Sequence, residues 1–156
     1  MAVVGPSAAV EPALSRARKI GERLARAGAV VLCGGLGGVM EAACLGASAA
    51  GGVTVGLLPG VDRGAANAYL TVALATGLGE LRNGLLVRAA DVVIGVGGGW
   101  GTLSELALAR RTGTPVVLLG SWRVSGAGPQ DGDLGVRVRS PSRAVEVALA
   151  LAAAQA

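Results

Sequence analysis

Two glycine clusters, each placed directly after a short apolar run, limit most strongly what this chain can fold into. The first cluster covers residues 34–38 and follows the run 29–33, and the second covers residues 97–101 and follows the run 91–96. A helical pattern comes after each cluster. Units of strand, turn and helix pair their strands in parallel through right-handed crossovers. The clusters therefore predict an α/β protein.

The same alternation extends along the whole chain. Apolar runs predict strands over residues 1–4, 29–33, 53–58, 69–75, 91–96, 115–119 and 136–139. Apolar residues at helical spacing predict helices over residues 11–27, 39–50, 80–90, 102–111 and 141–154. We predict one domain over residues 1–156, with a three-layer, Rossmann-like α/β fold and a doubly wound parallel sheet. The polar, glycine-rich segment 120–140 is predicted to be a mobile loop with a short strand at residues 136–139.

The composition agrees with a buried parallel sheet. Hydrophobic residues make up 52% of the chain, aromatic residues only 2%, and Phe is absent. The core must therefore consist of Val, Leu, Ile and Ala, as in sheets covered on both faces. No apolar run reaches the ~18–20 residues that span a bilayer, and the first residues lack a signal-peptide pattern. We expect a cytoplasmic protein.

The chain offers few reactive side chains. It has no His, which excludes Ser–His and Cys–His nucleophile pairs and any His-based metal site. Cys33 and Cys44 are too few for a disulfide framework and are predicted to be small core residues. We predict no metal site and no resident cofactor. The net charge of +4 is dispersed, so anionic small molecules are expected as partners rather than nucleic acid or a membrane.

Both glycine clusters are predicted to bind an anion. Each lies where a parallel strand ends, and ligands of such sheets bind at that edge. Glycine lets main-chain N–H groups approach a ligand closely, and the positive end of the following helix favours negative charge. We therefore predict a phosphate-bearing, nucleotide-like ligand. The predicted binding residues are Gly34, Gly35, Gly37, Gly38, Gly97, Gly98, Gly99, Trp100, Gly101 and Thr102.

Two common nucleotide motifs do not fit. Neither cluster is followed by the Lys and Ser/Thr of the Walker pattern. In the first cluster, Met40 stands where the dinucleotide fingerprint requires its third glycine. The sequence therefore supports neither nucleoside triphosphate hydrolysis nor a nicotinamide cofactor.

The spacing of several residues resembles the LONELY GUY-type family, long mislabelled as lysine decarboxylases. The first half of the resemblance lies in Cys33–Met40 and Gly56–Pro59, and the second in Arg82 and Gly97–Glu105. The last segment is similar to the family's hallmark P-G-G-x-G-T-x-x-E, which an Arg precedes. The resemblance covers roughly residues 1–120.

This resemblance implies an activity. The family's enzymes are phosphoribohydrolases, which cut the N-glycosidic bond of nucleoside 5′-monophosphates and release the base. Arg82 and Glu105 would be the catalytic pair, and the residues after Gly97 would hold the phosphate. A carboxylate at this place suits the chemistry, because it can stabilise an oxocarbenium-like state and orient water. The family is usually dimeric, which implies a homodimer or higher homo-oligomer.

Departures from the hallmark imply a second function. Gly97 replaces the Pro, Asn83 replaces a Lys, and Gly79 replaces a Met. In these positions the chain is more similar to the branch that contains molybdenum-cofactor carrier proteins. That branch is implied to bind a pterin-type phosphate ligand without hydrolysing it.

Four residues keep structural alternatives. Thr102 and Glu105 have the spacing of a capping box, in which each side chain satisfies a free N–H at the start of a helix. Arg82 could be a surface residue of its helix. Trp100 could stack on a base or pterin, or pack at a dimer contact.

Overall fold

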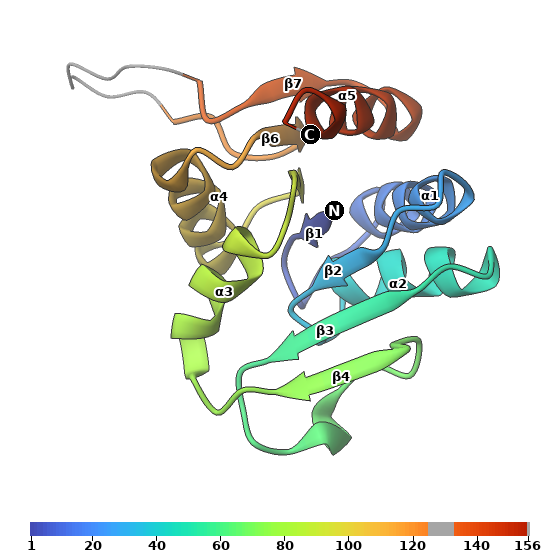
Figure 1. Ribbon diagram of the computed structural model, residues 1–156, viewed down its shortest axis with the longest axis vertical. Coiled ribbons are helices and arrows are strands. Elements are labelled where there is room, and N and C mark those ends of the chain that lie inside the picture. The colour runs from blue at the N-terminus through green and yellow to red at the C-terminus, as the bar shows by residue number, and fades with distance from the viewer. Residues whose placement is uncertain (125–132, 156) are drawn as a thin grey trace.

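The computed structural model describes residues 1–124 and 133–155, which form one sheet whose neighbouring strands are all parallel (Figure 1). Its strand order is β4-β3-β2-β1-β5-β6-β7. The strands are β1 (Ala2–Val4), β2 (Val31–Cys33), β3 (Thr54–Leu58), β4 (Val72–Ala75), β5 (Val93–Val96), β6 (Val116–Leu119) and β7 (Val136–Val138). From β1 the chain winds outward to β4 and then returns to the other side of β1. Strand order therefore reverses between β1 and β5.

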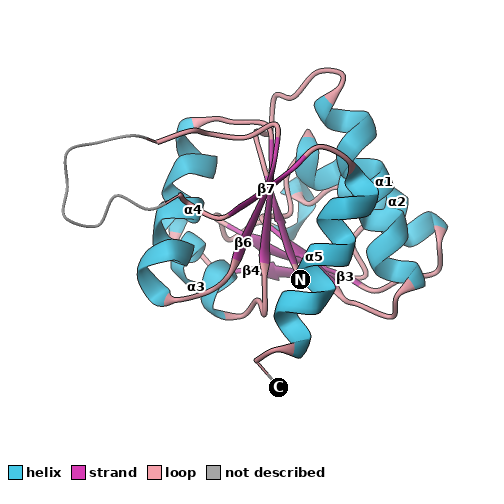
Figure 2. Ribbon diagram, turned by 90° about the horizontal axis from the view of Figure 1, so that it is seen from above, coloured by secondary structure: helices cyan, strands magenta, loops and turns pink. Residues whose placement is uncertain are grey.

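Helices cover both faces of the sheet, which gives three layers (Figure 2). The helices are α1 (Ala13–Arg26), α2 (Val39–Ala49), α3 (Arg82–Arg88), α4 (Trp100–Thr112) and α5 (Pro141–Ala153). Helices α1, α2 and α5 lie on one face, and α3 and α4 lie on the other. Short 3-10 turns occupy Arg63–Ala65 and Gly79–Leu81. The predicted doubly wound, Rossmann-like fold is confirmed.

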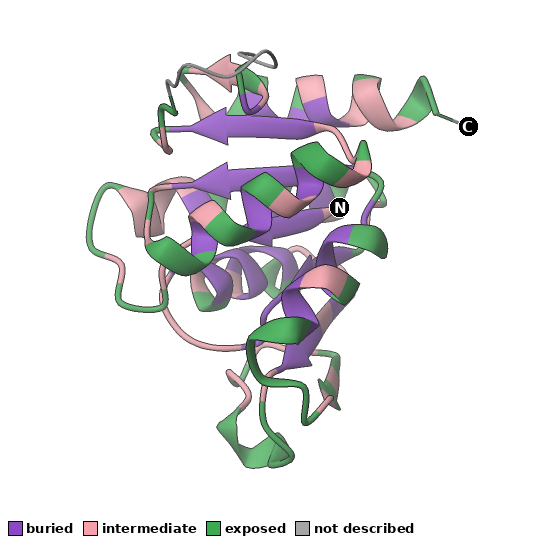
Figure 3. Cartoon of the chain, turned by 90° about the vertical axis from the view of Figure 1, so that its left-hand side faces the viewer, coloured by how far each residue is buried: buried purple, intermediate pink, exposed green. Residues whose placement is uncertain are grey.

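The central strands are buried (Figure 3), and their side chains alternate between two core clusters on opposite faces of the sheet. In β1, Val3 packs toward α1, α2 and α5, while Ala2 and Val4 pack toward α3 and α4. Strand β5 alternates in the same way, with Ile94 on the first side and Val93 on the second. Both faces are apolar because both are covered.

The small residues of α2 allow an unusually close helix pair. A Cβ at Gly46 would overlap the carbonyl oxygen of Arg18, and a Cβ at Gly21 would overlap that of Ala43. Helices α1 and α2 therefore touch backbone to backbone. This contact holds α2, which follows the first glycine cluster, directly against α1.

The two cysteines are buried and free, as predicted. Their Sγ atoms lie 3.5 Å apart, and they pack with Met40 beside the first glycine cluster. Cys33 ends β2, and its Sγ accepts a hydrogen bond of 3.3 Å from the N–H of Gly35.

Some boundaries differ from those predicted. Helix α4 begins at Trp100 rather than at Thr102, and α3 begins at Arg82 after a 3-10 turn. Strand β7 lies where a strand over residues 136–139 was predicted, whereas residues 125–132 of the predicted mobile loop lie outside the described residues. Among the described residues, no helix is long and apolar enough to cross a membrane.

Candidate phosphate-binding site

The two glycine clusters form turns at the same edge of the sheet. Strand β1 lies between β2 and β5, so three loops follow one another along the carboxyl edge (Figure 1). They are the first glycine turn (residues 34–38), the β1–α1 loop (residues 5–12) and the second glycine turn (residues 97–99). The second turn lies at the reversal of strand order, where ligands of open α/β sheets bind. The predicted placement of both turns at one edge is confirmed.

Pro6 lies between the two turns. A Cβ at Gly38 would overlap the carbonyl oxygen of Pro6, and a Cβ at Gly97 would lie 3.6 Å from the Cδ of Pro6. Pro6 was not among the predicted site residues, although it directly follows a strand and a glycine. A ligand that touches both glycine turns must therefore span the β1–α1 loop.

The second turn has a backbone conformation that requires glycine. Gly97 has φ +68°, in the left-handed region that side chains avoid. Proline fixes φ near −65° and cannot adopt this value. The Pro of the resembled hallmark is therefore incompatible with the turn as this chain folds it.

Within residues 1–124 and 133–155, no side chain caps the start of α4. Gly99 is the N-cap residue, with an extended backbone and no side-chain hydrogen bond to the helix. Thr102 is 2% exposed, lies inside the first turn, and its Oγ1 has no partner in the described part of the chain. The capping box is therefore wrong, because Glu105 pairs with another helix. The first N–H groups of α4 have no intrahelical partner and are available to an anion.

Arg82 and Glu105 form a buried ion pair between α3 and α4. Arg82 Nη1 donates to Glu105 Oε1 over 3.2 Å, and the two residues are 7% and 6% exposed. Arg82 is therefore no surface residue. A Cβ at Gly34 would lie 2.6 Å from Nη2 and 2.7 Å from Nη1 of Arg82. The pair thus joins the first glycine turn to the helix that follows the second.

The carboxyl group of Glu105 titrates close to neutrality. Burial raises the pKa of Glu105 to about 7, although the charge and hydrogen bond of Arg82 pull the pKa down. Arg82 Nε and the neighbouring Asn83 Oδ1 are also buried, without a hydrogen-bond partner among the described residues. Perturbed, incompletely satisfied polar groups of this kind are typical of functional sites.

Trp122 covers the second turn from the side opposite Pro6. Its Nε1 donates to the carbonyl oxygen of Gly99 over 3.1 Å, and a Cβ at Gly98 would lie 3.0 Å from Nε1. Its ring centroid lies 5.5 Å from that of Trp100, at an interplanar angle of 35°. Sequence reasoning missed Trp122, because it lies in the segment predicted to be a loop.

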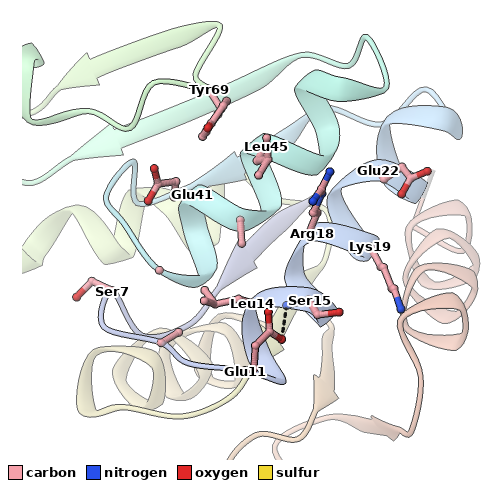
Figure 4. A pocket seen from close by; sticks show the side chains of 13 residues that line it. Ser7, Glu11, Leu14, Ser15, Arg18, Lys19, Glu22, Glu41, Leu45 and Tyr69 are labelled. Carbon is pink, nitrogen blue, oxygen red and sulfur yellow. Dashed lines mark hydrogen bonds between the residues drawn. The ribbon is translucent and has the colours of Figure 1, made fainter.

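A separate groove of about 790 Å³ runs between α1 and α2 (Figure 4). It mixes the carboxylates of Glu11, Glu22 and Glu41 with the cations Arg18 and Lys19. Gly38 is the one residue of the predicted site that lines it. The Arg82–Glu105 pair lies on the other face of the sheet, so the groove and the pair are different features.

The sheet and its turns define a Rossmann-like α/β protein with glycine turns at the carboxyl edge. The model of the SLOG cluster4 family matches residues 1–150, and the chain belongs to this family. An uncharacterized protein of Archaeoglobus fulgidus is 40% identical over 117 residues, which are 75% of this chain and 77% of that protein.

Two solved structures are similar over nearly the whole chain. The molybdenum cofactor binding protein of Rippkaea orientalis is 34% identical, with a TM-score of 0.85, and the match covers 96% of this chain and 94% of that one. The molybdenum cofactor carrier protein of Chlamydomonas reinhardtii is 32% identical, also with a TM-score of 0.85, and the match covers 97% and 96%.

Proposed function

We propose that this protein binds a phosphate-bearing pterin ligand of the molybdenum-cofactor type and carries it unchanged. The observation that carries the proposal is the similarity of almost the whole chain, at 32–34% identity, to proteins described as binding or carrying that cofactor. The two matches cover 96% and 97% of this chain.

The second glycine turn is proposed to hold the phosphate. The first N–H groups of α4 are free of side-chain caps, and the helix dipole adds a positive potential at the same place. The buried Oγ1 of Thr102, which has no hydrogen-bond partner among the described residues, is a further donor within this turn. A phosphate here would lie at the reversal of strand order.

The ion pair favours binding over hydrolysis. Arg82 and Glu105 are more than nine-tenths buried, and each is the ion-pair partner of the other. A sugar or a water molecule could reach Glu105 only if the pair opened. Gly97 supports the same assignment, since its φ excludes the Pro of the phosphoribohydrolase hallmark.

The test is calorimetric titration with the molybdenum cofactor under anaerobic conditions, followed by recovery of the ligand. We expect saturable binding, a melting temperature that rises with ligand concentration, and release of chemically unchanged cofactor. If the molybdenum cofactor at millimolar concentration neither binds nor shifts the melting temperature, the proposal is contradicted.

Phosphoribohydrolase activity is the second candidate, carried by one observation. Glu105 stands at the position of the hallmark Glu, next to Arg82, and its pKa of about 7 lets it hold or release a proton near neutral pH. If the ion pair with Arg82 separated, the carboxylate of Glu105 could stabilise the positive charge that develops at C1′ of the ribose.

This candidate is tested with a panel of nucleoside 5′-monophosphates. Hydrolysis would release free base and ribose 5-phosphate, and Glu105→Ala would slow the release by about 10²–10⁴-fold. Glu146→Ala is the control, because Glu146 lies on the exposed side of α5. No release by the wild type, or undiminished release by Glu105→Ala, excludes the activity.

A further inference from the structure

The chain places its only two tryptophans side by side at the second glycine turn. It contains two Trp, one Tyr and no Phe. Trp100 is the first residue of α4, and Trp122 follows β6. Large aromatic residues normally supply core volume, yet neither indole belongs to the buried core, and Trp122 only packs against its edge.

One indole is fixed and the other is presented to solvent. Trp122 is held by the hydrogen bond from Nε1 to Gly99, and its carbonyl oxygen accepts from Arg137 Nη2 over 2.8 Å. Arg137 is held in turn by Asp133, 3.0 Å away. Trp100 rests on this ring and is 81% exposed. An indole held at the surface beside polar main chain can offer a planar face to a ligand.

We propose that Trp100 and Trp122 bind the planar fused-ring heterocycle of the ligand by stacking, while the adjoining turn holds its phosphate. This inference rests on the proposed function and adds the part of the site that selects the ligand. It assigns the site to phosphomonoesters that carry a fused-ring heterocycle, and gives little affinity to sugar phosphates that lack one. Stacking tolerates different rings because each has a π-face, so pterin and purine phosphates share the required chemistry.

The position of the two tryptophans supports ring stacking on the indoles and phosphate binding at the adjoining turn. Trp122 lies directly against Gly98 and Gly99, and Trp100 is itself a residue of the first turn of α4. A phosphate on the N–H groups of this turn would therefore have an aromatic surface immediately beside it. Pro6 borders the same turn on the other side and offers no comparable planar surface.

The experiment compares Trp100→Ala and Trp100→Phe with the wild type by calorimetry. The probes are a pterin monophosphate, AMP, ribose 5-phosphate and unphosphorylated pterin. We expect Trp100→Ala to weaken both heterocyclic phosphates by about 5- to 100-fold and to change ribose 5-phosphate by less than about twofold. Trp100→Phe keeps a ring and should retain most of the affinity. Because Trp100 is exposed, none of these changes should lower the melting temperature appreciably.

The outcomes separate this inference from the proposed function. If pterin monophosphate binds the wild type and Trp100→Ala equally well, stacking is overturned and the proposed function stands. If unphosphorylated pterin binds through Trp100 but phosphate adds nothing, stacking is supported and the proposed function fails. If neither pterin monophosphate nor unphosphorylated pterin binds the wild type, both stacking and the proposed function fail. If sedimentation shows that Trp100→Ala splits an oligomer without changing ligand affinity, the pair is a subunit contact and the inference is overturned.

Discussion

The guanidinium group of Arg82 occupies the space in which a side chain at Gly34 would lie. Two of its nitrogens are within 2.7 Å of the position that a Cβ at Gly34 would take, and one of them donates to Glu105. The first glycine turn, α3 and α4 therefore meet at one buried charge pair. Disturbing any of the three should disturb the others.

Gly34→Ala should destabilise the protein by about 1–3 kcal/mol, because the new methyl group forces Arg82 away from Glu105. Chemical denaturation measures the loss. Gly84→Ala is the matched control: Gly84 lies in α3 with nothing near its missing Cβ, so alanine should stabilise the helix by about 0.5–1 kcal/mol. Equal effects of the two substitutions would show that Arg82 has no fixed place beside Gly34.

Removing one member of the Arg82–Glu105 ion pair should lower the free energy of unfolding more than replacing both members. Arg82→Ala leaves Glu105 buried without its partner, and at a pH high enough to keep the carboxyl group ionised this costs about 3–5 kcal/mol. The double variant Arg82→Met, Glu105→Leu replaces the pair with apolar side chains of similar size and should recover most of this loss. A double-mutant cycle by urea denaturation measures the coupling. Additive losses would contradict a buried, mutually dependent pair.

The raised pKa of Glu105 predicts a pH dependence of stability. Its folded-state pKa of about 7 exceeds the ordinary value of 4.5, so the folded protein binds more protons than the unfolded chain between these values. The contribution of Glu105 to the free energy of unfolding is therefore highest below pH 4.5 and falls as the pH rises toward 7.

Melting temperatures at pH 5 and pH 8 test this dependence. Glu105→Gln cannot ionise, so the wild type should lose stability relative to this variant when the pH rises from 5 to 8. Glu146→Gln, on the exposed side of α5, should follow the wild type. An unchanged difference between the wild type and Glu105→Gln at the two pH values would mean that Glu105 stays ionised throughout.

The periodicity of the sequence was sufficient to predict the fold, because each buried parallel strand is a local apolar run and each glycine cluster directly follows one. The order of helices and strands and the shared edge of both turns needed no long-range information. The family resemblance, rather than periodicity, brought Arg82 and Glu105 together, since they are distant along the chain.

What sequence reasoning missed depends on tertiary contacts. Thr102 and Glu105 have the spacing of a capping box, but α4 begins earlier, at Trp100, and the Glu105 side chain finds its partner on α3. Local hydrogen bonding is a weak preference that a buried ion pair overrides. Pro6 and Trp122 border the second turn only because β1 and β6 flank β5 in the sheet, an order that the pattern of apolar runs does not specify.

The last prediction concerns the turn that distinguishes this chain from the phosphoribohydrolase hallmark. At φ +68°, Gly97→Ala should cost about 1–2 kcal/mol. Gly97→Pro should cost more, because the ring requires a negative φ and the turn must change its path. Both variants should also weaken phosphoester binding, since the N–H groups at the start of α4 lose their alignment.

Gly101→Ala separates stability from binding in the same segment. Gly101 lies inside α4 with open space at its missing Cβ, so alanine should stabilise the helix by about 0.5–1 kcal/mol. If phosphate approaches this turn closely, the added methyl group should nonetheless reduce ligand affinity. Denaturation and calorimetry on the three variants measure both effects. A Gly97→Pro variant as stable and as tightly binding as the wild type would show that this turn does not require glycine at position 97.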